Sequence, residues 1–378
     1  MQDSNKKCKV LVLAAYYPTV DGARPLYYIH SRNLYYQANN IDVTVLNFSV
    51  KKGYIFDGIK IISLAEFDKK EADKYNILIL HAANIRNHYK FLVQYGSLFE
   101  KKIFVFHGHE ILHISKYYPA PYDFMVKKSV INGFLQDRYD DLKIAIWRRY
   151  FLKNIHNVRL IFVSKWIYKQ FLRELNVREK RLMNNAKIIS NSIGKIFEEM
   201  ERKTDNIVFD FLTIRSNMDD SKYGVDIVIK LAETYPNYKF CLIGKGNIFN
   251  YLKKPENLFW ISKEMTHEEI VQYINKSRIA LVPTREDTQG LIACEMASCG
   301  MPLITSDIEV CREVFSDCPR CAFINNDEPD LEKALRMLSK DTKENKAWQR
   351  YYARNTIIKE IEFIKKYFYL EKGTDGRV

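Results

Sequence analysis

The chain has 378 residues, which is long enough for two domains of roughly 150–200 residues each. Hydrophobic residues make up 47% and charged residues 28%, which excludes a disordered chain, and the 14 glycines and 10 prolines exclude collagen-like and low-complexity classes. The net charge of +13, with 25 tyrosines and 22 phenylalanines, suits a protein that binds phosphates, an anionic membrane surface or nucleic acid.

Short β-branched or aromatic runs alternate with amphipathic helical patterns in the first half of the chain. The predicted strands cover Val10–Ala15, Val43–Phe48, Ile77–Ala82, Ile103–His107, Leu160–Ser164 and Lys187–Ser190. The predicted helices cover Leu26–Gln37, Phe91–Glu100, Val126–Ile155 and Ile167–Leu175. Most of the strands are nearly continuous apolar runs, which is typical of parallel strands buried on both faces.

A polar stretch over residues 201–206 marks the predicted boundary, after which a second alternation begins. Its predicted strands are Ile207–Ile214, Lys239–Ile243, Leu258–Ile261, Ile279–Pro283, Leu303–Ser306 and Ala322–Ile324. Its predicted helices are Val225–Thr234, His267–Asn275, Leu291–Ser298, Val310–Phe315, Asp330–Leu338 and, at the end, Ala347–Tyr369. We therefore predict an α/β protein with domains at residues 1–203 and 204–345 and a helical segment at 346–378. Two doubly wound, Rossmann-like domains facing each other would hold a ligand in the cleft between the carboxyl ends of their strands.

The most informative motif runs from Pro283 to Ser306, where a strand, a polar loop and a helix follow one another. The free backbone N–H groups at the start of this helix, near Gly290, predict an anion site. Asp287 lies in the loop and Glu295 lies eight residues later in the helix. These two carboxylates are placed to accept hydrogen bonds from hydroxyl groups on two parts of one ligand, with a phosphate between them.

This stretch resembles the second domain of the family 4 retaining glycosyltransferases, which have the GT-B fold. Asp287 and Glu295 occupy the family's two acidic positions, and Gly300 with Pro302 its Gly-x-Pro. The resemblance implies that Asp287 contacts the transferred sugar, that Glu295 holds the nucleotide ribose, and that the intervening residues Thr288, Gln289 and Gly290 bind the donor. The family more often has Glu at the first position, so Asp287 is a departure, and the adjacent Glu286 is a rival for the role.

The resemblance extends along the second half and assigns further donor-binding residues there. Arg215 and Lys222 stand where the family holds the donor diphosphate, although Tyr223 separates Lys222 from the following glycine. Two fixed cations suit a leaving group that gains negative charge, and they remove the need for a metal. Gly244 ends one strand, and Ile261 lies at the strand end that reads the nucleobase in relatives.

In the first half, the resemblance rests on three strand ends. Gly22 lies in a loop after the first strand, where backbone can approach a ligand closely. His107 follows an apolar strand and stands where the family places a histidine near the sugar; His109 is the alternative. Asn191 lies in a strand-end motif before the interdomain linker. The final helix, as in relatives, is expected to return to the first domain.

Several features could indicate a metal or a membrane. Two histidines with a glutamate at 107–110, and Cys318 with Cys321, each lack the further ligands of a metal site, so we predict no metal. Residues 127–181 hold fourteen basic against five acidic residues, a net charge of +9, interleaved with Trp and Tyr. This pattern fits either a peripheral membrane-docking surface or a solvated helix face with its aromatic side chains turned inward. No nucleic-acid module is recognisable, so nucleic acid is not expected as a partner.

The resemblance implies a hexosyltransferase-type enzyme (EC 2.4), retaining, metal-independent and without a cofactor. It would move a sugar from a UDP- or GDP-linked donor to a glycan or lipid-linked acceptor, in cell-surface polysaccharide or glycolipid synthesis. No run of residues approaches the ~18–20 apolar positions of a membrane span, no signal-peptide pattern is present, and the seven cysteines are odd in number. We therefore expect a cytoplasmic protein, with peripheral contact at the inner face of the membrane if the basic stretch docks there. The alternatives are a GT-B sugar-nucleotide epimerase or hydrolase, and a non-catalytic, basic membrane-associated scaffold.

Overall fold

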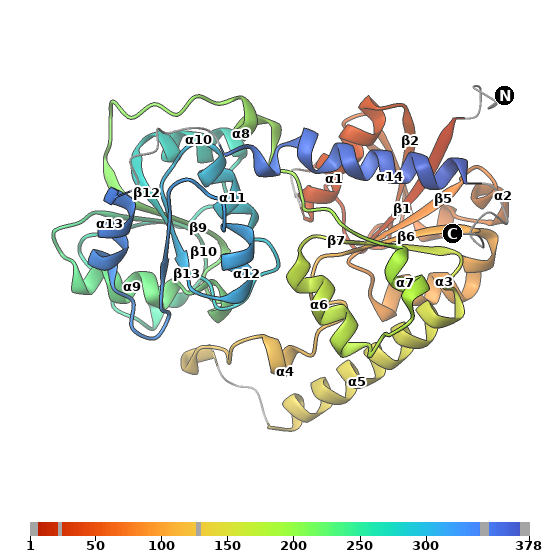
Figure 1. Ribbon diagram of the computed structural model, residues 1–378, viewed down its shortest axis with the longest axis horizontal. Helices are drawn as coiled ribbons and strands as arrows, with labels where there is room; N and C mark the ends of the chain where they lie inside the picture. The colour runs from red at the N-terminus through yellow and green to blue at the C-terminus, as the bar shows by residue number, and fades with distance from the viewer. Residues whose placement is uncertain (1–6, 22–24, 126–129, 341–347, 371–378) are drawn as a thin grey trace. The chain divides into compact units, whose positions relative to one another are not determined.

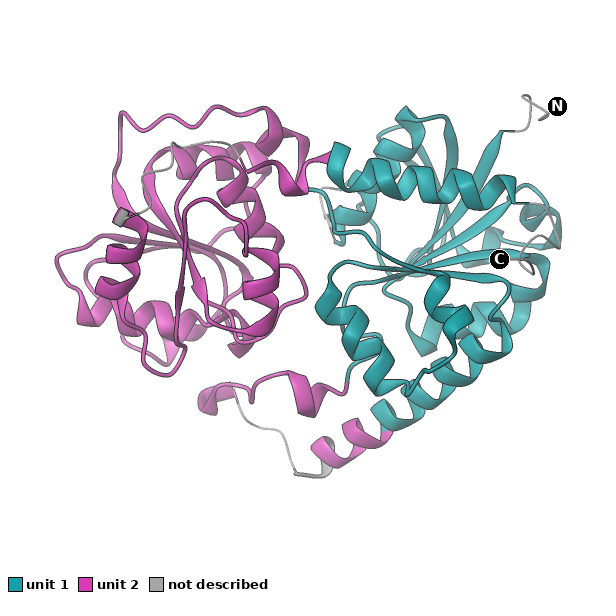
Figure 2. Ribbon diagram, viewed as in Figure 1, with its two compact units in different colours: residues 1–112, 139–192, 354–378 teal, residues 113–138, 193–353 magenta. Residues whose placement is uncertain are grey.

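A computed structural model describes residues 7–21, 25–125, 130–340 and 348–370 of the chain (Figure 1). The chain divides into two compact units (Figure 2). The first unit consists of residues 1–112, 139–192 and 354–378, and the second of residues 113–138 and 193–353. Both units are α/β structures built on a largely parallel sheet, as the alternating pattern predicts.

The first unit has, within its described residues, an eight-stranded sheet in the order β3-β4-β2-β1-β5-β6-β7-β8. The strands are β1 (Cys8–Ala14), β2 (Ile41–Asn47), β3 (Tyr54–Phe56), β4 (Ile59–Ile62), β5 (Ile77–His81), β6 (Lys101–Phe106), β7 (Val158–Phe162) and β8 (Ala186–Ile188). The helices are α1 (Tyr27–Ala38), α2 (Lys69–Ala72), α3 (Lys90–Tyr95), α6 (Lys165–Glu174), α7 (Lys180–Asn184) and α14 (Ile357–Tyr369). Helix α5 (Val130–Lys153) belongs to the first unit from residue 139 onward, and its beginning belongs to the second unit. Residues 10–13 of the central strand β1 are fully buried, because helices cover both faces of a doubly wound sheet.

One hairpin at the edge of this sheet is absent from the predicted elements. Strands β3 and β4 pair antiparallel, whereas every other described pair in the sheet is parallel. Asp57 and Gly58 form the turn with φ of 45° and 74°. Asp-Gly is the strongest short-range hairpin signal, because both residues accept the positive φ that a two-residue turn requires. The signal was present in the sequence, but the strands are too short to show an alternating pattern.

The second unit has, in its described part, a six-stranded parallel sheet in the order β11-β10-β9-β12-β13-β14. The strands are β9 (Phe209–Asn217), β10 (Phe240–Lys245), β11 (Leu258–Ile261), β12 (Ser277–Val282), β13 (Leu303–Ser306) and β14 (Cys321–Ile324). The helices are α4 (Ile114–Tyr117), α8 (Lys195–Glu199), α9 (Val225–Thr234), α10 (His267–Asn275), α11 (Leu291–Ser298), α12 (Glu309–Val314) and α13 (Leu331–Lys340). The strand order runs outward from β9 in one direction and from β12 in the other. The loops after these two strands therefore diverge and leave a crevice at the carboxyl edge.

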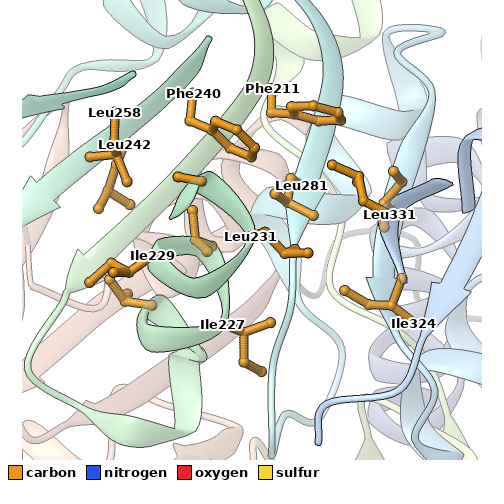
Figure 3. Close-up of a cluster of buried hydrophobic side chains, with 14 of the residues drawn as sticks. Phe211, Ile227, Ile229, Leu231, Phe240, Leu242, Leu258, Leu281, Ile324 and Leu331 are labelled. Carbon is orange, nitrogen blue, oxygen red and sulfur yellow. The ribbon is translucent and has the colours of Figure 1, made fainter. Parts of the chain in front are cut away.

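The core of the second unit fixes these two strands against their helices (Figure 3). Phe211 of β9 and Leu281 of β12 are buried with Leu231 of α9 and Leu331 of α13. Apolar contact on this face holds the strands in register, so the carboxyl ends of β9 and β12 lie side by side.

The last predicted helix begins later than its sequence pattern indicates. The helix predicted over Ala347–Tyr369 is helical from Ile357 to Tyr369, and short 3₁₀ turns precede it at Gln349–Tyr351 and Ala353–Asn355. The backbone between these turns is extended at Tyr352, because Tyr351 is buried and the N–H of Ala353 bonds to Glu198 at 2.7 Å. Local tertiary contacts therefore override the helical periodicity before Ile357.

Helix α14 packs within the first unit through a buried polar cluster. Glu360 accepts hydrogen bonds from Nε of Arg32 at 3.1 and 3.3 Å and from the hydroxyl of Tyr36, all three side chains being buried. Arg32 and Tyr36 lie on α1, so this cluster joins two helices that are far apart in the sequence. None of the helices in the described ranges is both long and apolar enough to cross a membrane.

Candidate functional site

Arg215 is a buried cation at the carboxyl end of β9, 5% exposed. Its Nη2 donates to the carbonyl of Pro283 at 2.5 Å, which links the carboxyl end of β9 to the loop after β12. Its Nε has no hydrogen-bond partner within the described residues. Burial lowers the pKa of Arg215, and the negative charge of Asp287 opposes that effect. A desolvated guanidinium with an unused donor is suited to binding an oxyanion.

Lys222 lies in the 3₁₀ turn Ser221–Tyr223, between β9 and α9. Its ammonium group lies 4.8 Å from the ring of Tyr223 and 5.5 Å from the ring of Tyr118, and 3.7 Å from Asp220. Burial disfavours its charge, but the neighbouring Tyr223 and the surrounding carboxylates outweigh burial and raise the pKa of Lys222. Lys222 is therefore held as a cation beside the aromatic rings.

Asp287 holds the loop between β12 and α11 in shape. Its Oδ1 accepts the backbone N–H groups of Thr288 at 2.7 Å, Gln289 at 3.2 Å and Gly290 at 2.8 Å. Asp287 therefore holds the loop that leads into α11, whereas α11 itself begins at Leu291, so an anion site at the helix start stays a prediction. Gly290 has φ of 71°, which an L side chain rarely adopts, and an added Cβ would lie 3.3 Å from Asp287 Oδ2.

Two further carboxyl groups in this region are buried, and burial raises the pKa of each. Glu286 is 6% exposed, and its Oε1 has no hydrogen-bond partner in the part of the chain described. Burial, reinforced by the charge of Asp287, raises the pKa of Glu286 to about 8. Glu295 of α11 is 8% exposed, and burial raises its pKa to about 8, opposed by a backbone hydrogen bond from Gly194. Sequence spacing singled out Glu295, whereas the burial of Glu286 could not be read from spacing.

A small pocket in the second unit brings several of the predicted residues together. Its lining includes Arg215, Asp287, Gln289, Gly290, Thr305 and Cys311. The pocket therefore joins the carboxyl ends of β9 and β12 with the start of α11, where a doubly wound sheet places its ligand.

Gly244 and Ile261 lie on the other side of β9, at the ends of β10 and β11. Gly244 has φ of 150°, and an added Cβ would come within 2.0 Å of the carbonyl oxygen of Arg215, so only glycine fits. Its own carbonyl accepts the indole N–H of Trp260 at 3.0 Å. Ile261 is half-buried and pairs with Ile243 in the sheet. These strand ends are thus fixed beside the backbone of Arg215.

A segment that the sequence analysis left without a role, residues 113–125, packs on the loops around Lys222. The hydroxyl of Tyr122 donates to Asp226 at 2.9 Å, and Asp226 also accepts a bidentate pair from Arg285 at 2.7 and 2.6 Å. The ring of Phe124 stacks on Tyr251 with centroids 4.8 Å apart. Together with Tyr118 over Lys222, these contacts make the 113–125 segment part of the second unit's site. Its tyrosines were visible in the sequence, but nothing local indicated their partners.

In the first unit, His107 directly follows β6 and lies on a loop fixed by Glu110. Glu110 accepts the backbone N–H groups of His107 at 2.6 Å and Gly108 at 2.5 Å. The imidazole of His107 bonds to His81 at 3.1 Å and packs against the ring of Tyr28, whereas His109 is exposed. The sequence analysis did not single out His81.

Of the other two residues predicted for the first unit, Asn191 is buried in a polar cluster and Gly22 is not described by the structure. Asn191 is 5% exposed and its Oδ1 accepts from Nη1 of Arg32 at 2.6 Å, so it belongs to the buried cluster around Glu360. Gly22 lies outside the described residues. Over the ranges that the structure describes, no three histidine, cysteine, aspartate or glutamate side chains form a group that could hold a metal ion. The seven cysteines, Cys318 and Cys321 included, are free thiols.

Comparisons with known proteins agree with this arrangement. Residues 198–355, most of the second unit, match the family model of glycosyl transferases group 1. An uncharacterized glycosyltransferase of Methanocaldococcus jannaschii is 24% identical over 359 residues, covering 88% of this chain and 89% of that protein.

Solved structures share the fold over nearly the whole chain at low identity. Sucrose-phosphate synthase from Thermosynechococcus elongatus has a TM-score of 0.62 at 13% identity, covering 96% of this chain and 95% of that one. A trehalose-6-phosphate structure from E. coli, bound with UDP-2-fluoro glucose, has a TM-score of 0.58 at 13% identity, covering 96% and 99%. WaaG, a glycosyltransferase involved in lipopolysaccharide biosynthesis, has a TM-score of 0.55 at 12% identity, covering 96% of both chains.

Two doubly wound units of this topology define the GT-B fold, and the second unit carries the matched family domain. The protein is accordingly a glycosyltransferase enzyme, similar over residues 198–355 to glycosyl transferases group 1. The predicted fold class and enzyme class are confirmed.

Proposed function

We propose that the protein is a retaining, family 4-type glycosyltransferase that moves a hexose from a nucleotide-linked donor to a glycan or lipid-linked acceptor. The observation that carries the proposal is the site at the carboxyl ends of β9 and β12. There the buried Arg215, with an unused Nε donor, lines the same pocket as Asp287 and Gln289. A desolvated guanidinium beside a carboxylate matches a ligand that combines a phosphate with sugar hydroxyls.

Each residue then has a chemical role in the transfer. Arg215 and Lys222 stabilise the diphosphate as it gains negative charge on leaving, which is the electrostatic contribution that a metal makes elsewhere. Asp287 offers its Oδ2 to the sugar while its Oδ1 remains bonded to its own loop. Glu295 bonds to the ribose hydroxyls, and His107 is the catalytic residue that we assign to the first unit.

The donor belongs to the UDP- or GDP-linked hexoses, and the acceptor belongs to cell-surface polysaccharide or glycolipid synthesis. UDP-2-fluoro glucose in one structural neighbour favours UDP over GDP, and the lipopolysaccharide role of another favours a lipid-linked acceptor. We propose no metal and no organic cofactor, because the two cations supply the charge that the leaving group needs.

Calorimetric titration with UDP and GDP tests the donor site directly. We expect one of the two to bind the wild type, and Arg215→Gln to weaken that binding at least about 10-fold, because a charged hydrogen bond contributes about 1.5–3 kcal/mol. Arg336→Gln is the matched control, since Arg336 lies exposed on α13 and its pair with Glu332 spans 3.7 Å at the surface. Failure of both nucleotides to bind the folded wild type would refute the proposal.

Peripheral contact with an anionic membrane is a second proposal, supported by helix α5. Phe134, Leu135, Tyr139 and Leu142 are each 45–59% exposed, and the guanidinium of Arg138 lies 5.2 Å from the ring of Phe134. In the later half of the helix, by contrast, the aromatic side chain of Trp147 is buried, as expected for a solvated helix with its aromatic residues turned inward. We expect salt-sensitive binding to anionic vesicles that Leu142→Ser weakens. Equal binding to neutral vesicles at high salt would contradict an electrostatic contact.

A further inference from the structure

Two histidines lie beside each other at the carboxyl edge of the first unit's sheet. His81 is the last residue of β5 and pairs with Val105 of β6, and His107 lies two residues beyond Val105. Because side chains in a strand repeat with a period of two, His81, Val105 and His107 share one face of the sheet. Their rings meet there, with Nδ1 of His81 3.1 Å from Nε2 of His107.

The backbone holds His81 in this position. Its neighbour Ala82 has φ of 48°, in the left-handed region that non-glycine residues rarely enter, and the N–H of Ala82 bonds to the carbonyl of Val105 at 3.3 Å. The chain therefore turns away immediately after His81 and leaves its ring against β6. A strained residue that persists beside a functional side chain is held there by its surroundings.

Both imidazoles are neutral, and their surroundings contain a fixed cation. His81 is fully buried, and burial followed by the charge of Arg32 lowers the pKa of His81 and of His107 well below its usual value. Arg32 is itself held by Glu360 and Asn191. Nε2 of His81 has no hydrogen-bond partner among the residues that the structure describes.

These facts decide which ring donates. If His107 donated from Nε2, His81 would carry its hydrogen on the buried Nε2, without an acceptor and in the field of a guanidinium that can only donate. If His81 donates from Nδ1, its buried Nε2 is a lone pair, which a neighbouring cation favours. Orphaned buried N–H groups are rarer than under-used acceptors, so the second arrangement is the stable one.

We propose that His81 is a positioning residue that donates its Nδ1–H to Nε2 of His107 and thereby fixes His107 as the tautomer with its hydrogen on Nδ1. The lone pair of His107 is then occupied by His81, so His107 cannot accept a proton as a general base. This consequence for catalysis rests on the proposed function, whereas the tautomer itself does not.

Long-range ¹H–¹⁵N correlation spectra of the ¹⁵N-histidine-labelled full chain test the proposal, because the two tautomers give different coupling patterns. We expect both His81 and His107 to carry hydrogen on Nδ1 in the wild type, with the signals assigned by loss in His81→Asn and His107→Gln. His81→Asn retains an N–H at the δ position and should leave His107 as the Nδ1–H tautomer. His81→Leu removes the donor and should let the Nε2–H form of His107 appear.

A control variant and a kinetic measurement distinguish a positioning role of His81 from a purely structural role. His156→Leu, at an exposed histidine of the same unit, should leave the His107 signal unchanged. Once the donor and acceptor are identified, His81→Leu should lower kcat more than it changes KM for the donor. His81→Asn should keep most of the wild-type kcat. A wild-type spectrum with hydrogen on Nε2 of His107, or no change in His81→Leu, would overturn the proposal.

The wild-type spectrum decides even if His81→Leu does not fold. The spectrum also tests the tautomer of His107 if the protein transfers no sugar. A wrong tautomer assignment and a wrong proposed function can therefore be told apart.

Discussion

Glu286 and Glu295 are buried carboxyl groups that keep their protons at neutral pH in the folded chain. Burial raises the pKa of each from 4.5 to about 8. The folded state therefore binds protons that the unfolded chain releases near pH 4.5. Their contribution to stability is fully present below that pH and is lost as the pH rises through about 8.

Stability should accordingly fall as the pH rises from 5 to 8. We expect Glu286→Gln to flatten this dependence by on the order of 1–3 kcal/mol in the free energy of unfolding, because the amide has no proton to lose. Urea denaturation at several pH values measures the effect. Glu332→Gln, at a side chain 66% exposed on α13, is the control and should change nothing. Identical slopes for Glu286→Gln and the wild type would contradict the buried, protonated state.

Asp287 has a structural role that is separable from its proposed contact with the sugar. Its Oδ1 accepts three backbone N–H groups, so Asp287→Ala should lower the free energy of unfolding by about 1–2 kcal/mol, as the loss of a helix cap does. Asp287→Asn keeps an oxygen acceptor and should cost less than half as much. Urea denaturation of the two variants compares these costs. Equal stability of Asp287→Ala and the wild type would mean that the loop does not depend on this carboxylate.

At the scale of elements, the 113–125 segment connects aromatic side chains to the loops that carry Lys222 and Arg285. Tyr122, Asp226 and Arg285 form a hydrogen-bonded chain, and Tyr118 covers Lys222. The phenol of Tyr122 donates to Asp226, and burial together with the charge of Asp226 raises the pKa of Tyr122. The position of this segment should therefore affect how Lys222 is presented to a diphosphate.

A double-mutant cycle between Tyr122→Phe and Asp226→Asn measures the connection. We expect a coupling energy of about 1–2 kcal/mol in urea unfolding, since a hydroxyl bonded to a charged carboxylate is stronger than a neutral pair. Tyr118→Leu should weaken nucleoside diphosphate binding a few-fold, whereas Tyr369→Leu, exposed on α14, should not. Additive effects in the cycle would show that the segment is not held by this bond.

The elements that the sequence predicts well carry their signal in their own residues, whereas several that it misses depend on other parts of the chain. Helices α9, α10 and α11 have the predicted bounds, because the signal lies in their own residues. Helices α9 and α10 are amphipathic, and α11 is a run of mostly small and apolar residues that is buried from Ala293 to Ser298. The β3–β4 hairpin was missed because its strands are too short to show an alternating pattern, and the 113–125 segment was missed because its partners lie far along the chain. The same holds for the site: the spacing of Asp287 and Glu295 is local, but the bond between His81 and His107 depends on strand register.

At the scale of the whole molecule, the charge of +13 divides into groups with different surroundings. Arg215 is buried at the pocket, Lys222 lies between aromatic rings, and Arg32 is locked in the cluster with Glu360. Composition gives the net charge of the chain, whereas burial determines which cations are desolvated and suited to binding a ligand. Sequence therefore predicted the class of enzyme, and the structure adds which of its charges are desolvated.

We expect the chain to transfer a sugar, and not only to bind or hydrolyse a sugar nucleotide. The most direct measurement follows a radiolabelled hexose from UDP- and GDP-linked donors into the lipid and glycan fractions of membranes, with the wild type, Arg215→Gln and Arg336→Gln. We predict label in one of these fractions with the anomeric configuration of the donor retained, at least about 10-fold less with Arg215→Gln, and no change with Arg336→Gln. Label recovered solely as free sugar, or an inverted linkage, would contradict this account.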